Sequence, residues 1–86
     1  MHVEIYTRPG CSFCDKAKDL MNAKGITYYE HKLNIDFTRA SLTEKFSTAK
    51  TYPVIVVDGF YVGGFTEFNT IVEQRSRDTK QYLREA

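Results

Sequence analysis

The stretch that most constrains the fold of this chain is TYPVIVVDGFYVGG, at positions 51–64. Its run VIVV at 54–57 is apolar at every position, which is typical of a strand buried on both faces of a sheet. Asp58-Gly59 follows at once and is a strong signal for a two-residue hairpin turn. The sequence therefore predicts a buried central strand and an antiparallel partner at 60–62.

A strand and a helix are predicted at the N-terminus. HVEIY at 2–6 alternates polar and apolar residues and is rich in β-branched and aromatic side chains, which favours a strand. Apolar residues then recur at helical spacing between about 12 and 24. Gly25 follows where a residue with a left-handed backbone commonly ends a helix.

A second strand and helix are predicted before the hairpin. The segment 26–35 reads as a strand, with alternate residues on one face: Tyr29, His31, Leu33 and Ile35. Asp36 is expected to cap the next helix, because a side-chain oxygen there can accept a hydrogen bond from a free backbone N–H. The residues expected to face inward from that helix are Ala40, Leu42 and Phe46.

A third helix is predicted after Gly63-Gly64, with Thr66 as its N-cap. Its apolar positions are Phe68, Ile71 and Val72. Beyond about Ser76 the pattern thins, so residues 77–86 are expected to form a separate helical turn or to fray. The order is βαβαββα, which predicts one α/β domain spanning 1–86.

Charge and hydropathy exclude several classes of protein. The net charge is only +1, whereas nucleic-acid binders carry a basic surface. No apolar run approaches the roughly 18 residues of a membrane span. MHVEIYTR at the N-terminus does not suit a signal peptide, so a cytoplasmic location is expected. Structural disulfides are rare in that reducing compartment.

The only two cysteines, Cys11 and Cys14, lie in RPGCSFC. A structural zinc site needs about four cysteine or histidine ligands. The chain adds only His2 and His31, on separate predicted strands, and their spacing matches no known site. Haem attachment requires a histidine after the second cysteine, where Asp15 stands. A metal-free reactive pair is the interpretation that remains best supported, ahead of a structural crosslink.

The local pattern fits such a pair. Cys11 is placed where a loop meets a helix, and the free N–H groups and helix dipole there favour a thiolate. Its thiol pKa is therefore expected to fall from about 8.5 toward the ~3.5–7.5 range of comparable motifs. Cys14 lies one turn further on, within reach of the first sulfur. We predict Cys11 as the nucleophile and Cys14 as the resolving thiol.

Charged residues near Cys11 are candidates to tune it. Arg8, Lys16 and Lys18 could add positive charge, and Asp15 would oppose them. Each is equally well explained as a solvated surface charge. Arg8 has the strongest claim, because it borders the loop before the nucleophile.

These motifs together resemble a known family. A strand ending in IYTR and then C-x-x-C at a helix start is similar to thioredoxin-fold proteins. Thr51-Tyr52-Pro53 resembles the T-V-P motif of the glutaredoxins, whose proline is cis. The stretch 63–67, GGFTE, resembles their G-G-x-D-D motif. The resemblance covers residues 2–75 in order, and it implies a thioredoxin/glutaredoxin fold with a four-stranded mixed sheet flanked by at least three helices.

The resemblance also implies a glutathione groove. Arg8 matches the basic residue that meets a glutathione carboxylate, and Phe13 matches an aromatic residue that is usually tyrosine. Tyr52 precedes the cis proline, and in the family the backbone at that point pairs with the cysteine of glutathione, as a strand would. The remaining residues implied in this groove are Thr51, Pro53, Gly64, Thr66 and Glu67.

The function implied is a dithiol glutaredoxin. Such a protein reduces protein disulfides and glutathione mixed disulfides and is recharged by glutathione. We expect this chain to be a monomer. Two alternatives stay open. One is a thioredoxin-like electron donor to a dedicated partner such as ribonucleotide reductase, recharged by a flavoprotein reductase. The other is a 2Fe–2S carrier that uses glutathione as a ligand, because Ser12 replaces the usual motif proline as in some cluster-binding relatives.

Overall fold

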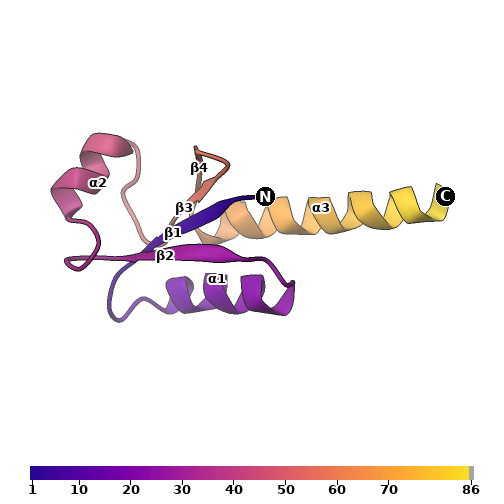
Figure 1. Ribbon diagram of the computed structural model, residues 1–86, viewed down its shortest axis with the longest axis horizontal. Helices are drawn as coiled ribbons and strands as arrows, with labels where there is room; N and C mark the ends of the chain where they lie inside the picture. The colour runs from indigo at the N-terminus through magenta and orange to yellow at the C-terminus, as the bar shows by residue number, and fades with distance from the viewer. Residues whose placement is uncertain (86) are drawn as a thin grey trace.

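The structure of the chain is a computed structural model that describes the backbone of residues 1–85 and the side chains of residues 1–75. Its elements follow the order βαβαββα, which confirms the predicted order (Figure 1). They are β1 (Val3–Thr7), α1 (Ser12–Ala23), β2 (Tyr28–Lys32), α2 (Arg39–Lys45), β3 (Val54–Val57), β4 (Phe60–Gly63) and α3 (Phe65–Glu85). None of the described helices is both long and apolar enough to cross a membrane.

The four strands form one mixed sheet in the order β2-β1-β3-β4. β1 runs parallel to β2 and antiparallel to β3, and β4 returns beside β3. The predicted hairpin is confirmed, with positive φ at Asp58 (52°) and Gly59 (86°), as a type I′ turn requires. β1 and β3 are therefore the central strands, and the chain leaves β1 directly into the cysteine motif.

Each face of the sheet packs against helices. One face, with Ile5 and Ile55, is covered by α1 and α3, which contribute Met21 and Phe68 to the same cluster. The other face packs against α2 through Leu42. The alternating positions of β3 thus serve two cores, which explains why the VIVV run has no polar face.

The structure corrects the prediction for the second helix. Its N-cap is Thr38, whose hydroxyl accepts from Ser41 N at 3.1 Å while Ser41 Oγ accepts from Thr38 N at 3.0 Å. Asp36 instead accepts the backbone N–H of Lys32 at 2.8 Å and closes the turn after β2. Leu42 is buried, but Ala40 is exposed, because residues two apart on a helix point to nearly opposite sides.

The second strand is shorter than predicted. β2 lies at the sheet edge and ends at Lys32, and Asn34 then takes a left-handed backbone with φ of 65°. Ile35 is 77% exposed as a result. Tyr28, rather than Tyr29, packs against the core.

The third helix begins one residue before Thr66, so the prediction of Thr66 as its N-cap is wrong. Glu67 performs the capping instead, since its Oε1 accepts the N–H of Gly64 at 2.7 Å. Phe68 and Val72 are buried as predicted. The helix continues to Glu85 without a break, where the sequence predicts either a separate helical turn or a frayed end over 77–86.

Candidate active site

Cys11 lies at the junction of loop and helix that the sequence predicts. β1 ends at Thr7, and Gly10, with φ of 69°, turns the chain into α1. Cys11 is the N-cap of α1, and its sulfur accepts the backbone N–H of Cys14 at 3.1 Å. An anion on this sulfur would receive the same hydrogen bond and the positive end of the helix dipole.

The two cysteines form a disulfide in this structure. Their Cα atoms lie 5.2 Å apart, one helical turn along the chain. Cys11 is 7% exposed and Cys14 is 2% exposed. Cys11 is therefore the more exposed residue of the pair, although both are buried.

The Tyr52–Pro53 peptide bond is cis, as the resemblance implies. Gly64 lies against this turn, because a Cβ built on it would be 3.4 Å from the carbonyl oxygen of Pro53. Glu67 caps the same glycine through its N–H. The structure thus brings Pro53 next to Gly64 and Glu67, at the start of α3.

The other predicted groove residues fall into smaller groups. The guanidinium of Arg8 lies 6.0 Å from the ring centroid of Tyr52, and the rings of Phe13 and Phe65 are 6.2 Å apart. Thr51 and Tyr52 border a cleft of about 180 Å³ beside α2. Thr66 is exposed in the first turn of α3.

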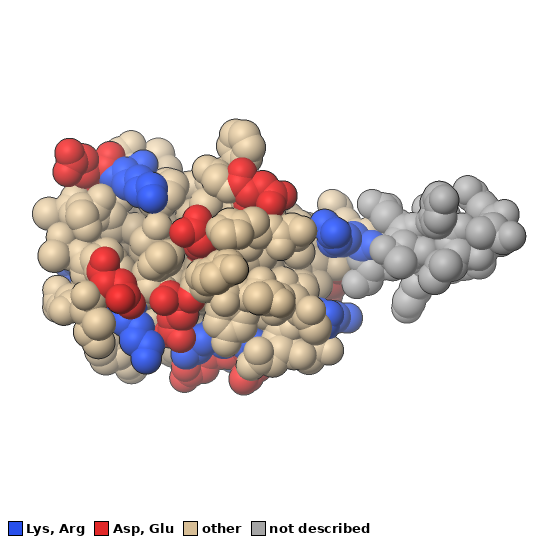
Figure 2. Space-filling view, in the orientation of Figure 1, with Lys and Arg blue, Asp and Glu red and all other residues tan. Residues whose placement is uncertain are grey.

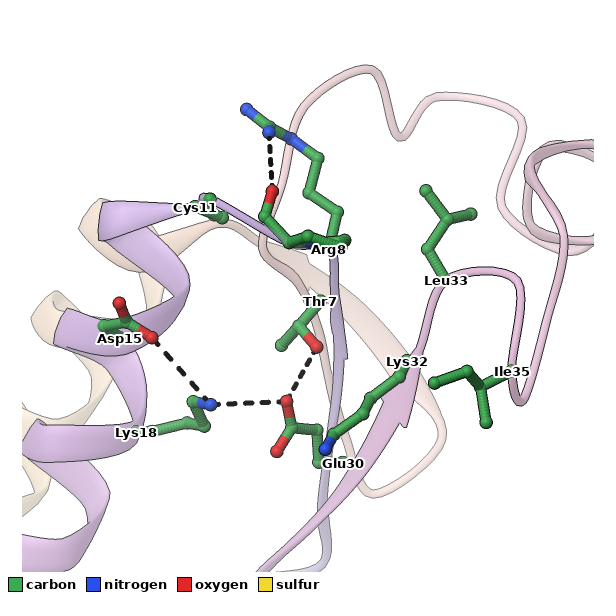
Figure 3. Close-up of a pocket in the computed structure, with 11 residues that line it drawn as sticks. Thr7, Arg8, Cys11, Asp15, Lys18, Glu30, Lys32, Leu33 and Ile35 are labelled. Carbon is green, nitrogen blue, oxygen red and sulfur yellow. Dashed lines mark hydrogen bonds and ion pairs between the residues drawn. The ribbon is translucent and has the colours of Figure 1, made fainter.

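A larger cleft of about 310 Å³ opens beside Cys11, between α1 and the end of β2 (Figure 3). Of the predicted catalytic and groove residues, Arg8 and Cys11 line it, together with Asp15 and Lys18, which the sequence names as candidates to tune Cys11. The side chains that sequence reasoning did not place in a site are Thr7, Glu30, Lys32, Leu33 and Ile35. They come from β1, β2 and the turn after β2, and only the parallel pairing of these strands brings them together.

Glu30 forms hydrogen bonds with two other residues at the floor of this cleft. Its Oε2 accepts from Thr7 Oγ1 at 2.7 Å and from Lys18 Nζ at 3.3 Å. Partial burial raises the pKa of this carboxyl, but these two hydrogen bonds and the charges of Lys18 and Lys32 outweigh it and hold the pKa below its ordinary value of 4.5. Lys18 Nζ also lies 3.9 Å from Asp15 Oδ1, so Lys18 forms ion pairs with both carboxylates.

The lowered pKa predicts an acid-dependent contribution to stability. A carboxyl with a lowered folded pKa stabilises the fold above its unfolded pKa, and the effect is lost as pH falls through the folded value. Glu30→Gln should thus be less stable than wild type at pH 7, by about 1 kcal/mol. The gap should close below pH 4.5. Urea unfolding across pH measures this, with Glu44→Gln, on an exposed part of α2, as control; a gap that stays constant with pH would contradict it.

Gly63 is expected to tolerate no side chain. Its φ is 126°, and a Cβ there would lie 2.5 Å from Glu67 Oε1, the atom that caps α3. Gly63→Ala should lower the free energy of unfolding by about 2–4 kcal/mol, through backbone strain and loss of the cap. Gly25→Ala is the control, since its φ is 68° and its Cβ meets nothing within 4 Å. Equal losses in the two variants would show that the contact with Glu67 is unimportant.

The site can be compared with known proteins. A model of the glutaredoxin family matches residues 3–62. Glutaredoxin 3 of Escherichia coli K12 is 40% identical over 65 residues, 73% of this chain and 76% of that protein. The hybrid peroxiredoxin hyPrx5 of Haemophilus influenzae is 39% identical over 62 residues, 72% of this chain but only 25% of that longer protein.

The fold agrees with the sequence match. The crystal structure of glutaredoxin 1 from Francisella tularensis, complexed with cacodylate, superposes with a TM-score of 0.72 and 28% identity, over 88% of this chain and 96% of that one. The four-stranded mixed sheet with its three helices is the glutaredoxin/thioredoxin fold. With Cys11 and Cys14 as its redox-active pair, this chain belongs to the glutaredoxin family of thiol-disulfide oxidoreductases.

Proposed function

We propose that this protein is a glutathione-dependent dithiol oxidoreductase that reduces protein disulfides and glutathione mixed disulfides. The observation that carries the proposal is Cys11 as the N-cap of α1, and the Tyr52–Pro53 turn packed against Gly64 supports it. The first feature supplies a stabilised thiolate. At the second, the backbone of Tyr52 is proposed to pair with a peptide-like thiol such as glutathione.

Cys11 acts as the nucleophile in this proposal. Its thiolate attacks a substrate disulfide, a bond forms between Cys11 and one substrate sulfur, and the other sulfur leaves as a thiolate. Cys14 then attacks the Cys11 sulfur and releases the second substrate thiol. The substrate disulfide is reduced by two electrons, and the Cys11–Cys14 disulfide seen in the structure is the oxidised product. Two glutathione molecules return the pair to the dithiol.

Glutathione is proposed to bind along the cis-proline turn. Arg8 faces one of its carboxylates, and the Tyr52 backbone pairs with its cysteine. Its γ-glutamyl end lies at the start of α3, where the backbone N–H groups favour a carboxylate. Glu67 already uses Oε1 for Gly64, so Oε2 is the oxygen left for the glutathione ammonium. The groove residues completing this set are Phe13, Thr51, Pro53 and Thr66.

The cell context proposed is the reducing cytoplasm, where glutathione is abundant and a monomer would suffice. The partners are glutathione and proteins with accessible disulfides. No metal takes part in this cycle, because two thiols and glutathione account for all the electrons transferred.

Arg8→Ala tests the groove. The guanidinium makes only one hydrogen bond to another group of residues 1–75, to Pro9 O at 3.2 Å, so it is accessible to a carboxylate. Removing it should raise the KM for glutathione about three- to tenfold and change kcat little, since one exposed charged contact is lost. The assay couples reduction of the mixed disulfide of glutathione and 2-mercaptoethanol to glutathione reductase. Lys24→Ala, at the far end of α1, is the matched control, and an unchanged KM in Arg8→Ala would exclude this role.

A further inference from the structure

The cleft lined by Thr7, Glu30, Lys32, Leu33 and Ile35 borders the nucleophile, and Arg8 is the one residue that it shares with the proposed glutathione groove. The strand order β2-β1-β3-β4 explains this. Pro53 and Gly64 belong to the β3–β4 side of Cys11, and the cleft belongs to the β2 side. Cys11 lies between the two, at the end of the loop that leaves β1.

The polar floor of the cleft is satisfied within the protein. Glu30 accepts from Thr7 and Lys18, and Lys18 also lies near Asp15. No buried side-chain nitrogen or oxygen among the described residues lacks a partner. An incoming molecule therefore finds little unpaired hydrogen-bonding capacity on this floor.

The rim offers two other kinds of contact. Leu33 is half-buried and Ile35 is 77% exposed, and both project from the end of β2 and the following turn toward the cleft (Figure 3). The lining carries one net positive charge, because it contains three basic residues (Arg8, Lys18 and Lys32) and two acidic ones (Asp15 and Glu30). Among the side chains of residues 1–75, Lys32 has no ion pair within 4.0 Å. The rim thus presents an aliphatic surface beside Lys32, whose charge acts on Glu30 without forming a direct ion pair with it.

We propose that this cleft is a subsite for protein substrates, which takes an aliphatic side chain and a neighbouring carboxylate from the segment that flanks the target cysteine. The aliphatic group packs on Leu33 and Ile35, and the carboxylate approaches Lys32. The inference rests on the proposed function, because it requires Cys11 to be the sulfur that bonds to the substrate. It adds a substrate preference that glutathione, held on the other side, does not explain.

The subsite acts at the mixed-disulfide stage. The Cys11 thiolate attacks one sulfur of the substrate disulfide, and the other sulfur leaves with the bonding electron pair as a thiolate. While the substrate segment is bonded to Cys11, its flanking residues lie over the cleft. Cys14 then attacks Cys11 and frees the segment as a second thiolate, which takes a proton from water.

The experiment uses symmetrical disulfides of five-residue peptides, each with a central cysteine. The first peptide has the sequence Glu-Ile-Cys-Ile-Glu. The second has lysine in place of glutamate, and the third has serine in place of isoleucine. Wild type should reduce the first about fivefold faster than the second or the third, in kcat/KM at low salt.

Two variants assign these preferences to the cleft. Lys32→Glu should abolish or reverse the preference for glutamate over lysine, while Lys24→Glu, with the same change of net charge, should keep it. Ile35→Ser should abolish the preference for isoleucine over serine. Phe60→Ser is its control, because Phe60 is a comparably exposed apolar residue, 76% exposed, on the distant hairpin. Ratios between peptides are compared, so any general loss of activity cancels.

The mixed disulfide of glutathione and 2-mercaptoethanol separates this inference from the proposed function. Turnover of that small substrate with equal rates for all three peptides would overturn the subsite alone. A preference that survives in Lys32→Glu and Ile35→Ser would overturn it too. No turnover of any disulfide would overturn the proposed function and the subsite with it.

Discussion

Cys11→Ser is expected to abolish exchange with every disulfide substrate. A serine hydroxyl is not ionised near neutral pH, and its oxygen cannot form a mixed disulfide with the substrate. The rate of exchange should therefore fall at least ~1,000-fold, to the uncatalysed background. The fold should survive, because Cys11 is an N-cap and serine is among the best residues there. The loss can therefore be assigned to chemistry.

The measurement is the glutathione-coupled rate on the mixed disulfide of glutathione and 2-mercaptoethanol, and on a protein disulfide. Circular dichroism and urea unfolding of the same sample check the fold. Cys11→Ser with normal structure and measurable turnover would show that another group begins the reaction, and the assignment of Cys11 would be wrong.

Cys14→Ser is expected to separate the two reactions. Its Sγ is needed to displace a protein substrate from Cys11, and as an intramolecular nucleophile it acts at a high effective concentration. Reduction of protein disulfides should therefore fall by about 100-fold or more. Reduction of glutathione mixed disulfides should remain within a few-fold of wild type, because a second glutathione can resolve the intermediate at Cys11.

The same two substrates provide the measurement, and mass spectrometry should detect protein substrate trapped on Cys11 in the variant. Cys14 is 2% exposed, so a buried hydroxyl replaces its thiol, and stability must be checked beside activity. Equal losses on both substrates in a folded variant would contradict the division of roles between the two cysteines.

Local patterns allowed most of the fold to be predicted from the sequence. The VIVV run, the Asp58-Gly59 turn and the helical spacing of Phe68 and Val72 each report a short-range preference, and the structure confirms all three. The residues at which helices and strands begin and end are harder to predict from the sequence. Asp36 and Thr38 are both good caps, and the turn that Asp36 closes with Lys32 decides between them.

The sequence predicts those residues of the candidate site that belong to short contiguous motifs. C-x-x-C and the proline after Tyr52 are recognisable in one dimension, and both lie where the resemblance implies. The cleft on the β2 side has no such motif. Glu30 faces Thr7 because β1 and β2 pair in parallel, and Ile35 becomes exposed because β2 ends early. Those contacts depend on strand register, which single residue patterns do not specify.

The most direct test of glutathione dependence is the rate at which millimolar glutathione alone reduces the oxidised Cys11–Cys14 disulfide. Thioredoxin reductase with NADPH serves as the parallel reductant. We expect fast reduction by glutathione, slower reduction in Arg8→Ala, and little reduction by the reductase. Reduction by the reductase alone would contradict a working glutathione groove and would favour a dedicated electron donor instead.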